Sequence, residues 1–162
     1  EIRLSLVGSE MCIRDSPNEA RRPVRGIPIF EPLADQQLMA VPHHDLDDIM
    51  QTVLKRATDI LQLTPPFSAQ VEWTGRIIKG WYAMAYYRDV PGGDKIRVNC
   101  LLDSPDISRT TMEFLLWHEY LHLYLRKGHT RIFREQERAW PGCVEAEREL
   151  NTLNEKFGIQ YW

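Results

Sequence analysis

Two histidines and a glutamate stand close together as His118, Glu119 and His122, within the segment MEFLLWHEYLHLYL of residues 112–125. In a helix, the two imidazoles would project from one face about 6 Å apart along the axis. Imidazoles at that spacing can chelate one tetrahedral zinc ion. Glu119 would lie beside them, within reach of a water on the metal without being a ligand, as in the H-E-x-x-H arrangement of zinc hydrolases. The spacing therefore predicts His118 and His122 as zinc ligands and Glu119 as a general base.

The rest of this segment is apolar or aromatic on every side, which is typical of a buried helix. Ionisable side chains in such a helix need partners, because burying them alone costs several kcal/mol. One interpretation is that the three polar side chains simply hydrogen-bond other core groups. Three of them together in so apolar a helix favour a metal site instead.

A catalytic zinc site needs a third protein ligand and an open fourth position. His129 comes seven residues after His122 and directly after Gly128, where a tight turn can bring its ring back toward the metal. Glu145 and Glu147 are the competing ligands, because some H-E-x-x-H enzymes take a glutamate from a later helix. Their segment carries many charges, as a solvated helix face does, so we favour His129.

The elements that must position these residues begin with a helix over about residues 46–62, with Asp45 as its N-cap. Apolar residues recur there in steps of three and four, which predicts one buried stripe. Alternating and aromatic-rich stretches at 67–73, 81–87 and 95–100 follow. We expect them to form three antiparallel strands in a small sheet.

The metal-binding helix is expected to begin near Thr110, whose spacing to Glu113 is that of a capping box, and to stop at Gly128. Two further helices are expected over about 130–140 and 144–157. In the last helix, the side chains expected to point inward are those of Val144, Leu150, Leu153 and Phe157. The order of elements predicts an α+β fold with an N-terminal helix, the sheet, the metal-binding helix and C-terminal helices.

The chain divides into three parts by composition. Residues 1–16, EIRLSLVGSEMCIRDS, resemble a translated adapter sequence, and we expect them not to be native. Residues 17–42 are too rich in proline for a helix or a central strand, and we expect an extended lead-in. Residues 43–162 are expected to form one zinc metallopeptidase-like domain.

Bulk composition narrows the class of protein. The net charge of −3 lacks the basic excess usual in proteins that bind nucleic acid. No apolar run approaches the roughly 20 residues of a bilayer span, so we expect no membrane association. The three cysteines are far apart and form no C-x-x-C pair, which argues against a disulfide framework or a zinc ribbon. A cytoplasmic setting is therefore expected.

From about residue 66 to residue 157 the chain resembles the SprT-like and YgjP-like group of small zinc metallopeptidases. The strand KIRVNC before the helix, W-H-E-Y-L-H with G-H downstream, and the block HTRIFREQERAWPGCVEAERELN carry the likeness. The resemblance implies a zincin-like minimal metallopeptidase domain with one zinc ion per chain and His129 as third ligand. The chain departs from the family pattern at Leu121, where the family often has a small residue, and it lacks the cysteine zinc ribbon of SprT itself.

We therefore expect zinc-dependent hydrolysis of peptide bonds in a peptide or protein substrate, bound by strand addition along residues 95–100. One alternative is a zinc hydrolase of a nucleotide phosphoanhydride, with phosphate bound by Arg126, Lys127, Arg131 and Arg134. Another is a DNA-associated SprT-type protease, with charge from Arg21, Arg22 and Arg25 and from the cluster at residues 126–138, and base stacking on Trp73 and Trp81. A third, a non-catalytic zinc-stabilised domain, leaves Glu119 without a role.

Overall fold

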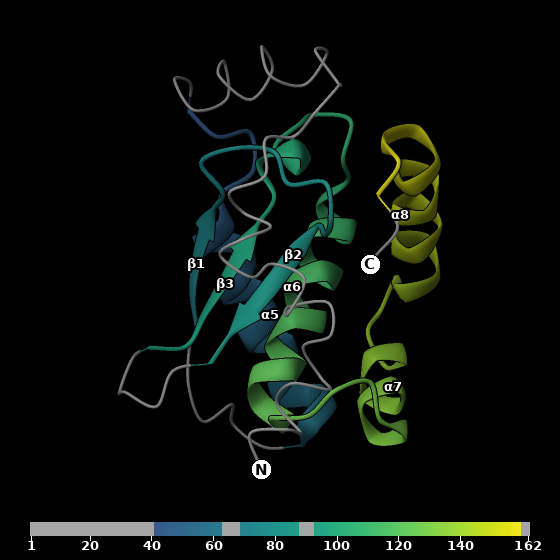
Figure 1. Ribbon diagram of the computed structural model, residues 1–162. Coiled ribbons are helices and arrows are strands. Elements are labelled where there is room, and N and C mark those ends of the chain that lie inside the picture. Colours follow the sequence, from purple (N-terminus) through teal and green to yellow (C-terminus); the bar gives the residue numbers. More distant parts are fainter. Residues whose placement is uncertain (1–40, 63–68, 88–92, 160–162) are drawn as a thin grey trace.

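The computed structural model describes residues 41–62, 69–87 and 93–159, which form an α+β fold (Figure 1). In chain order the elements are α5 (Leu46–Leu61), β1 (Gln70–Trp73), β2 (Ala83–Tyr86), β3 (Lys95–Val98), a 3-10 turn η1 (Cys100–Leu102), α6 (Arg109–Leu125), α7 (Arg131–Arg138) and α8 (Cys143–Phe157). The expectations for residues 1–40, for Phe67 and for the turn at residues 91 and 92 lie outside the described residues.

Helix α6 is the centre of the fold. It packs against α5, against β2 and β3, and against α7 and α8, so the sheet lies on one side of it and the last two helices lie on another (Figure 1). Every residue from Thr111 to Leu123 is buried, as the apolar composition predicts. Any polar side chain between Thr111 and Leu123 is therefore enclosed by protein.

The sheet is mixed, and the expectation of three antiparallel strands is wrong. β3 lies in the middle, antiparallel to β2 but parallel to β1, with Val71 opposite Ile96. Alternation of apolar and polar residues is the same for either strand direction, so the pattern could not reveal this order. β3 is paired on both sides, and the sheet's two edges are β1 and β2.

The caps of the helices explain where they begin. Asp45 caps α5 as expected, accepting a hydrogen bond from Asp48 N at 3.0 Å. The predicted cap at Thr110 is wrong, because α6 begins at Arg109 and its cap is Ser108. Glu149 of α8 accepts a hydrogen bond from Ser108 Oγ at 2.6 Å, so α8 fixes this start.

The C-terminal helices lie close to the predicted ranges. Leu150 and Leu153 of α8 are buried, and Phe157 packs against the core, but Val144 is 60% exposed, so its predicted inward position is wrong. Gly142 precedes α8 with φ of +82°, and a Cβ there would lie 2.6 Å from the Thr110 side chain. A glycine is therefore needed where the chain passes the start of α6.

Within the described ranges, no helix is both long and apolar enough to cross a membrane. Cys100 and Cys143 are free, buried thiols. Cys12 lies outside the described residues.

Asn99 holds the loop before β2 in place, although its position in the sequence predicts a polar strand face. Its side chain is fully buried and takes part in four hydrogen bonds: from Ile78 N at 3.3 Å and Leu101 N at 3.2 Å, and to Ile78 O at 2.6 Å and Trp81 O at 2.9 Å. These bonds tie the end of β3 to the segment that leads into the edge strand β2.

Substituting Asn99 by alanine is expected to lower the free energy of unfolding by about 3 kcal/mol, because buried backbone groups lose their partners. Urea unfolding followed by circular dichroism measures the change. Asn151→Ala is the matched control, since Asn151 is exposed and makes only a 3.4 Å contact with Asn154. Equal stability of the two variants would contradict this role for Asn99.

Candidate metal centre

Three histidine side chains meet beside the middle of α6. His118 and His122 are on α6 and are 1% and 2% exposed. His129 is in the turn that follows. Its Nε2 lies 3.1 Å from His118 Nε2, and His122 Nε2 lies 3.2 Å from the same atom. The ligand atoms of all three lie within 4.8 Å of one another, close enough to bind one metal ion.

The turn that returns His129 to α6 begins at Arg126 and not at Gly128 as predicted. Arg126 takes the left-handed conformation with φ of 51°, and its N–H bonds to His122 O. That conformation costs a non-glycine residue about 1–3 kcal/mol. Tertiary contacts offset this, because Arg126 forms an ion pair with Asp94 and lies over the Tyr87 ring.

The Nδ1 atoms of the two α6 histidines are held by acceptors. His122 Nδ1 donates to the carbonyl of Lys127 at 3.1 Å, and His118 Nδ1 lies 2.6 Å from the carboxylate of Glu137. Because a carbonyl or carboxylate oxygen accepts, each Nδ1 carries the proton. The Nε2 lone pairs therefore point into the shared space, which is the tautomer that a metal needs.

Burial keeps two of the rings neutral. It lowers the pKa of His122 to about 2, and electrostatic interaction with the neighbouring His118 and His129 adds to the effect. Burial, with a smaller contribution from the neighbouring His118, likewise lowers the pKa of His129 to about 4. Neutral imidazoles at physiological pH are ready to bind a metal without first releasing a proton.

Phe133 of α7 packs against all three imidazoles. Its ring centroid lies 5.0 Å from that of His118, 4.5 Å from that of His122 and 5.0 Å from that of His129. The Phe133 side chain is fully buried. It therefore walls one side of the histidine cluster and limits the positions that the three rings can take.

Glu119 is buried next to the cluster, at 2% exposure. Burial raises its pKa to about 7, although positive charge on His118 and the N–H of Ala85 act in the opposite direction. Its Oε2 has no hydrogen-bond partner among the described residues. A buried carboxylate oxygen without a partner is costly, so this atom is suited to a bound water or ligand.

Sequence reasoning gave no role at the site to Phe133 and Glu137 of α7, which both contact the histidine side chains. Glu137 is 1% exposed and contacts both His118 and Arg134. Burial pushes the pKa of Glu137 upward, but the hydrogen bond with His118 and the ion pair with Arg134 outweigh it and hold the pKa below its usual value. A signal existed: Phe133 and Glu137 follow His129 in steps of four, which places them on one helix face.

The competing ligands do not reach the cluster. Glu145 is exposed on α8 and Glu147 is half-buried there, and neither belongs to the group of possible metal ligands among the described residues. His44 is engaged elsewhere, with its ring 3.0 Å from Ser104 O, and His43 is exposed. His129 is therefore the third residue whose side chain lies close enough to share a metal ion with His118 and His122.

The donor set fits a metal such as zinc. A tetrahedral ion bound at about 2.0–2.1 Å holds its ligand nitrogens about 3.3 Å apart. The two Nε2 separations of 3.1 and 3.2 Å are close to this value. Three protein ligands would leave one tetrahedral position open for a water or substrate.

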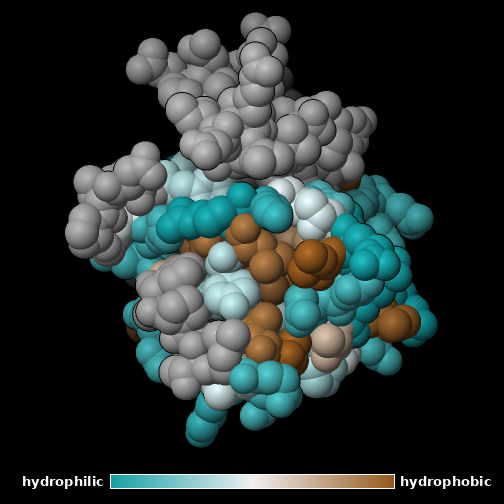
Figure 2. Space-filling model, turned by 90° about the horizontal axis from the view of Figure 1, so that it is seen from below, coloured by the Kyte–Doolittle hydropathy of each residue, from teal (hydrophilic) through white to brown (hydrophobic). Residues whose placement is uncertain are grey.

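The end of the molecule that carries the site has apolar surface. Figure 2 shows the molecule from the side where α5 and α6 end, and apolar residues gather at its centre inside a hydrophilic ring. Ile132, next to Phe133 on α7, is 52% exposed.

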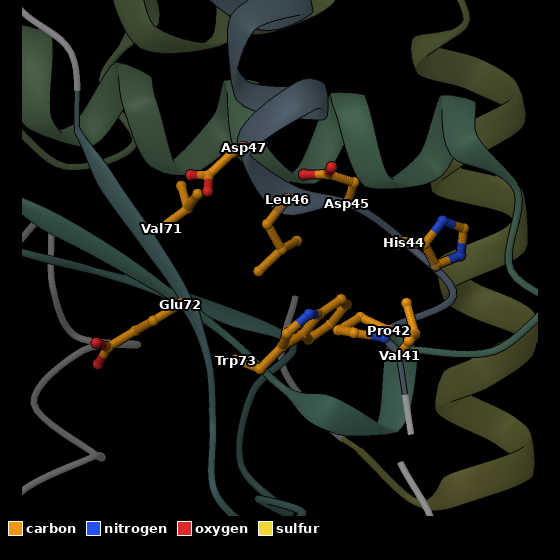
Figure 3. Close-up of a pocket in the computed structure, with 9 residues that line it drawn as sticks. All are labelled: Val41, Pro42, His44, Asp45, Leu46, Asp47, Val71, Glu72 and Trp73. Atoms are coloured by element: carbon orange, nitrogen blue, oxygen red, sulfur yellow. The ribbon is translucent and has the colours of Figure 1, made fainter. Parts of the chain in front are cut away.

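A separate pocket of about 370 Å³ lies between the start of α5 and β1. Figure 3 shows Leu46 and Trp73 turned toward each other there, with Asp45 and Asp47 above them. None of His118, His122 and His129 lines this pocket. It is therefore a second feature of the surface and not part of the metal centre.

Comparison with protein-family models, curated proteins and solved structures finds no match for this chain. The function is therefore inferred from the histidine cluster and the residues that surround it.

Proposed function

We propose that this protein is a zinc-dependent metallopeptidase with a zincin-like domain of the SprT-like kind. The observation that carries the proposal is the convergence of three imidazole Nε2 atoms beside the buried Glu119, one of whose oxygens lacks a partner among the described residues. Bound zinc would lower the pKa of a water toward neutrality and polarise the scissile carbonyl.

His118, His122 and His129 hold the metal in this mechanism. Glu119 accepts a proton from the attacking water and then delivers it to the leaving amine. A general base works best with a pKa near the working pH, and burial raises that of Glu119 to about 7. The buried carboxylate and its raised pKa support Glu119 as the general base.

Substrate is proposed to bind beside Glu119. The expectation of strand addition to residues 95–100 is wrong, because β3 at Lys95–Val98 is paired on both sides. β2 is an edge strand that lies beside the site, because its Ala85 N–H bonds to Glu119. Ala83, Met84 and Ala85 are 0–2% exposed, so β2 does not present an open edge for strand addition either.

Ion pairs weigh against a nucleotide phosphoanhydride as the substrate. Of the four side chains expected to bind phosphate, Arg126, Arg131 and Arg134 are paired with Asp94, Glu135 and Glu137, respectively, which leaves the exposed Lys127. Apolar surface at the same end of the molecule suits peptide side chains better than phosphate (Figure 2). A peptide substrate is therefore our proposal.

The two tryptophans expected to stack on bases are not open for that role. Trp81 is 1% exposed, so its ring cannot stack on a nucleic-acid base. Trp73 is half-buried and packs against the core. Neither of these two tryptophans therefore offers DNA an open platform beside the site.

The test combines elemental analysis with activity. We expect about one zinc per chain, and cleavage of casein or of a peptide library that stops with a chelator and returns with zinc. Nucleoside triphosphates are the comparison substrate, and we expect no turnover of them. Absence of zinc after reconstitution would refute the metal site, and triphosphate hydrolysis without peptide cleavage would replace the peptidase by a phosphohydrolase.

A further inference from the structure

Glu137 makes two strong contacts from a fully enclosed position. Its Oε1 lies 2.6 Å from His118 Nδ1, and its Oε2 lies 2.7 Å from a guanidinium nitrogen of Arg134. Glu137 is 1% exposed, while the Arg134 side chain is 42% exposed. A carboxylate is costly to bury unless it is paired and hydrogen-bonded, so the arrangement persists because both oxygens have cationic or N–H partners.

Helix α7 contacts α6 through two buried side chains and one hydrogen bond. Phe133 and Glu137 are its only buried residues. Phe133 contacts the three histidine rings, and Glu137 contacts His118. Away from the histidines, Trp117 Nε1 of α6 donates to Gln136 O of α7 at 3.3 Å. Phe133 and Glu137 lie four residues apart on α7, so they share one face of the helix, and His129 stands in the turn just before it.

We propose that Glu137 is a positioning residue for the metal: it holds His118 with its Nδ1 protonated and its Nε2 directed at the ion, and Arg134 balances the buried charge. A carboxylate that accepts from the outer nitrogen of a ligating imidazole fixes its tautomer and orientation and makes it a stronger ligand. This inference rests on the proposed metal site and assigns it a residue outside the ligand set.

The same helix offers a matched control. Glu135 is also paired with an arginine, Arg131, at 3.6 Å, but its side chain is 60% exposed and it does not contact the histidines. Glu135→Gln therefore removes one negative charge from α7 without touching the site. Glu137→Gln makes the same chemical change at the enclosed position, and Glu137→Leu removes the acceptor altogether.

Metal affinity is the first readout. Zinc dissociation constants of the full chain are measured by competition with a chromophoric chelator. We expect Glu137→Gln to weaken binding about 10-fold and Glu137→Leu to approach 100-fold, against less than about 2-fold for Glu135→Gln. Arg134→Gln should have a smaller effect than Glu137→Leu, because the bond to His118 survives.

A second readout separates positioning from general stability. Nitrogen-15 NMR of the imidazoles should show His118 protonated at Nδ1 in the wild type and a mixture of tautomers in metal-free Glu137→Leu. Circular dichroism should show that this variant remains folded.

The possible outcomes are distinct. Wild-type affinity in both Glu137 variants, or an unchanged His118 tautomer in Glu137→Leu, overturns the positioning role while leaving the metallopeptidase intact. An equal loss in Glu135→Gln overturns it as well, because the effect would then be one of net charge. A wild-type chain that binds no zinc overturns the proposed function together with this inference.

Discussion

Glu119→Gln is expected to bind metal as the wild type does and to cleave peptides about 10²–10⁴-fold more slowly. Glutamine keeps the size of the side chain but cannot take a proton from water. The measurements are zinc content and kcat/KM on one peptide substrate. Glu113→Gln is the matched control on the same helix, because Glu113 pairs with Arg109 and lies outside the site. Wild-type turnover in Glu119→Gln would contradict the role of Glu119 as general base.

The same substitution has a consequence for stability. The pKa of Glu119 is raised in the folded protein to about 7, so the folded state binds the proton more tightly than the unfolded state does. This group therefore lowers stability as pH rises from about 4.5 to 7, by up to about 3 kcal/mol in the metal-free protein. Glutamine removes the penalty. Metal-free Glu119→Gln should exceed the wild type in urea stability at about pH 8 and match it near pH 4.

His129→Ala is the second large effect. It removes one of the three proposed nitrogen ligands. Losing a residue that only hydrogen-bonds a ligand weakens metal binding up to roughly 100-fold, so we expect zinc affinity to fall by more than that. Peptide cleavage at low zinc should be lost in parallel. Metal stabilises the folded chain by mass action, so the rise in melting temperature on adding zinc should shrink as well.

His43→Ala provides the comparison, because His43 is an exposed histidine in the segment before α5. It should leave zinc content and melting temperature unchanged. Full zinc content in His129→Ala at micromolar metal would show that another residue completes the site. Glu145 and Glu147 would then have to be tested by the same substitution.

Short-range sequence patterns explain where most of the helices and strands form. The stripe of apolar residues in α5 and the cap at Asp45 appear where the sequence predicts them. The same holds for the buried α6, whose composition is apolar on all sides. Both depend on contacts within a few residues, which propensity and periodicity describe well.

Sheet order and helix ends depend on residues distant in the sequence. β1 pairs in parallel with β3 although β2 comes between them in the chain. Ser108 caps the start of α6 with support from Glu149 of α8, and Arg126 caps its end with support from Asp94 and Tyr87. A pattern of residue types does not contain these pairings, so it predicts Thr110 and Gly128 instead.

The sequence by itself determined the pair of histidines one helical turn apart, with Glu119 beside them, because helix geometry alone places those side chains. Only the tertiary structure decided that His129, and not a glutamate of α8, meets them. It also decided that Glu137, 19 residues after His118, accepts the hydrogen bond from His118 Nδ1. The physical reason is that a metal centre joins separate helices, and their packing sets which side chains come within bonding distance.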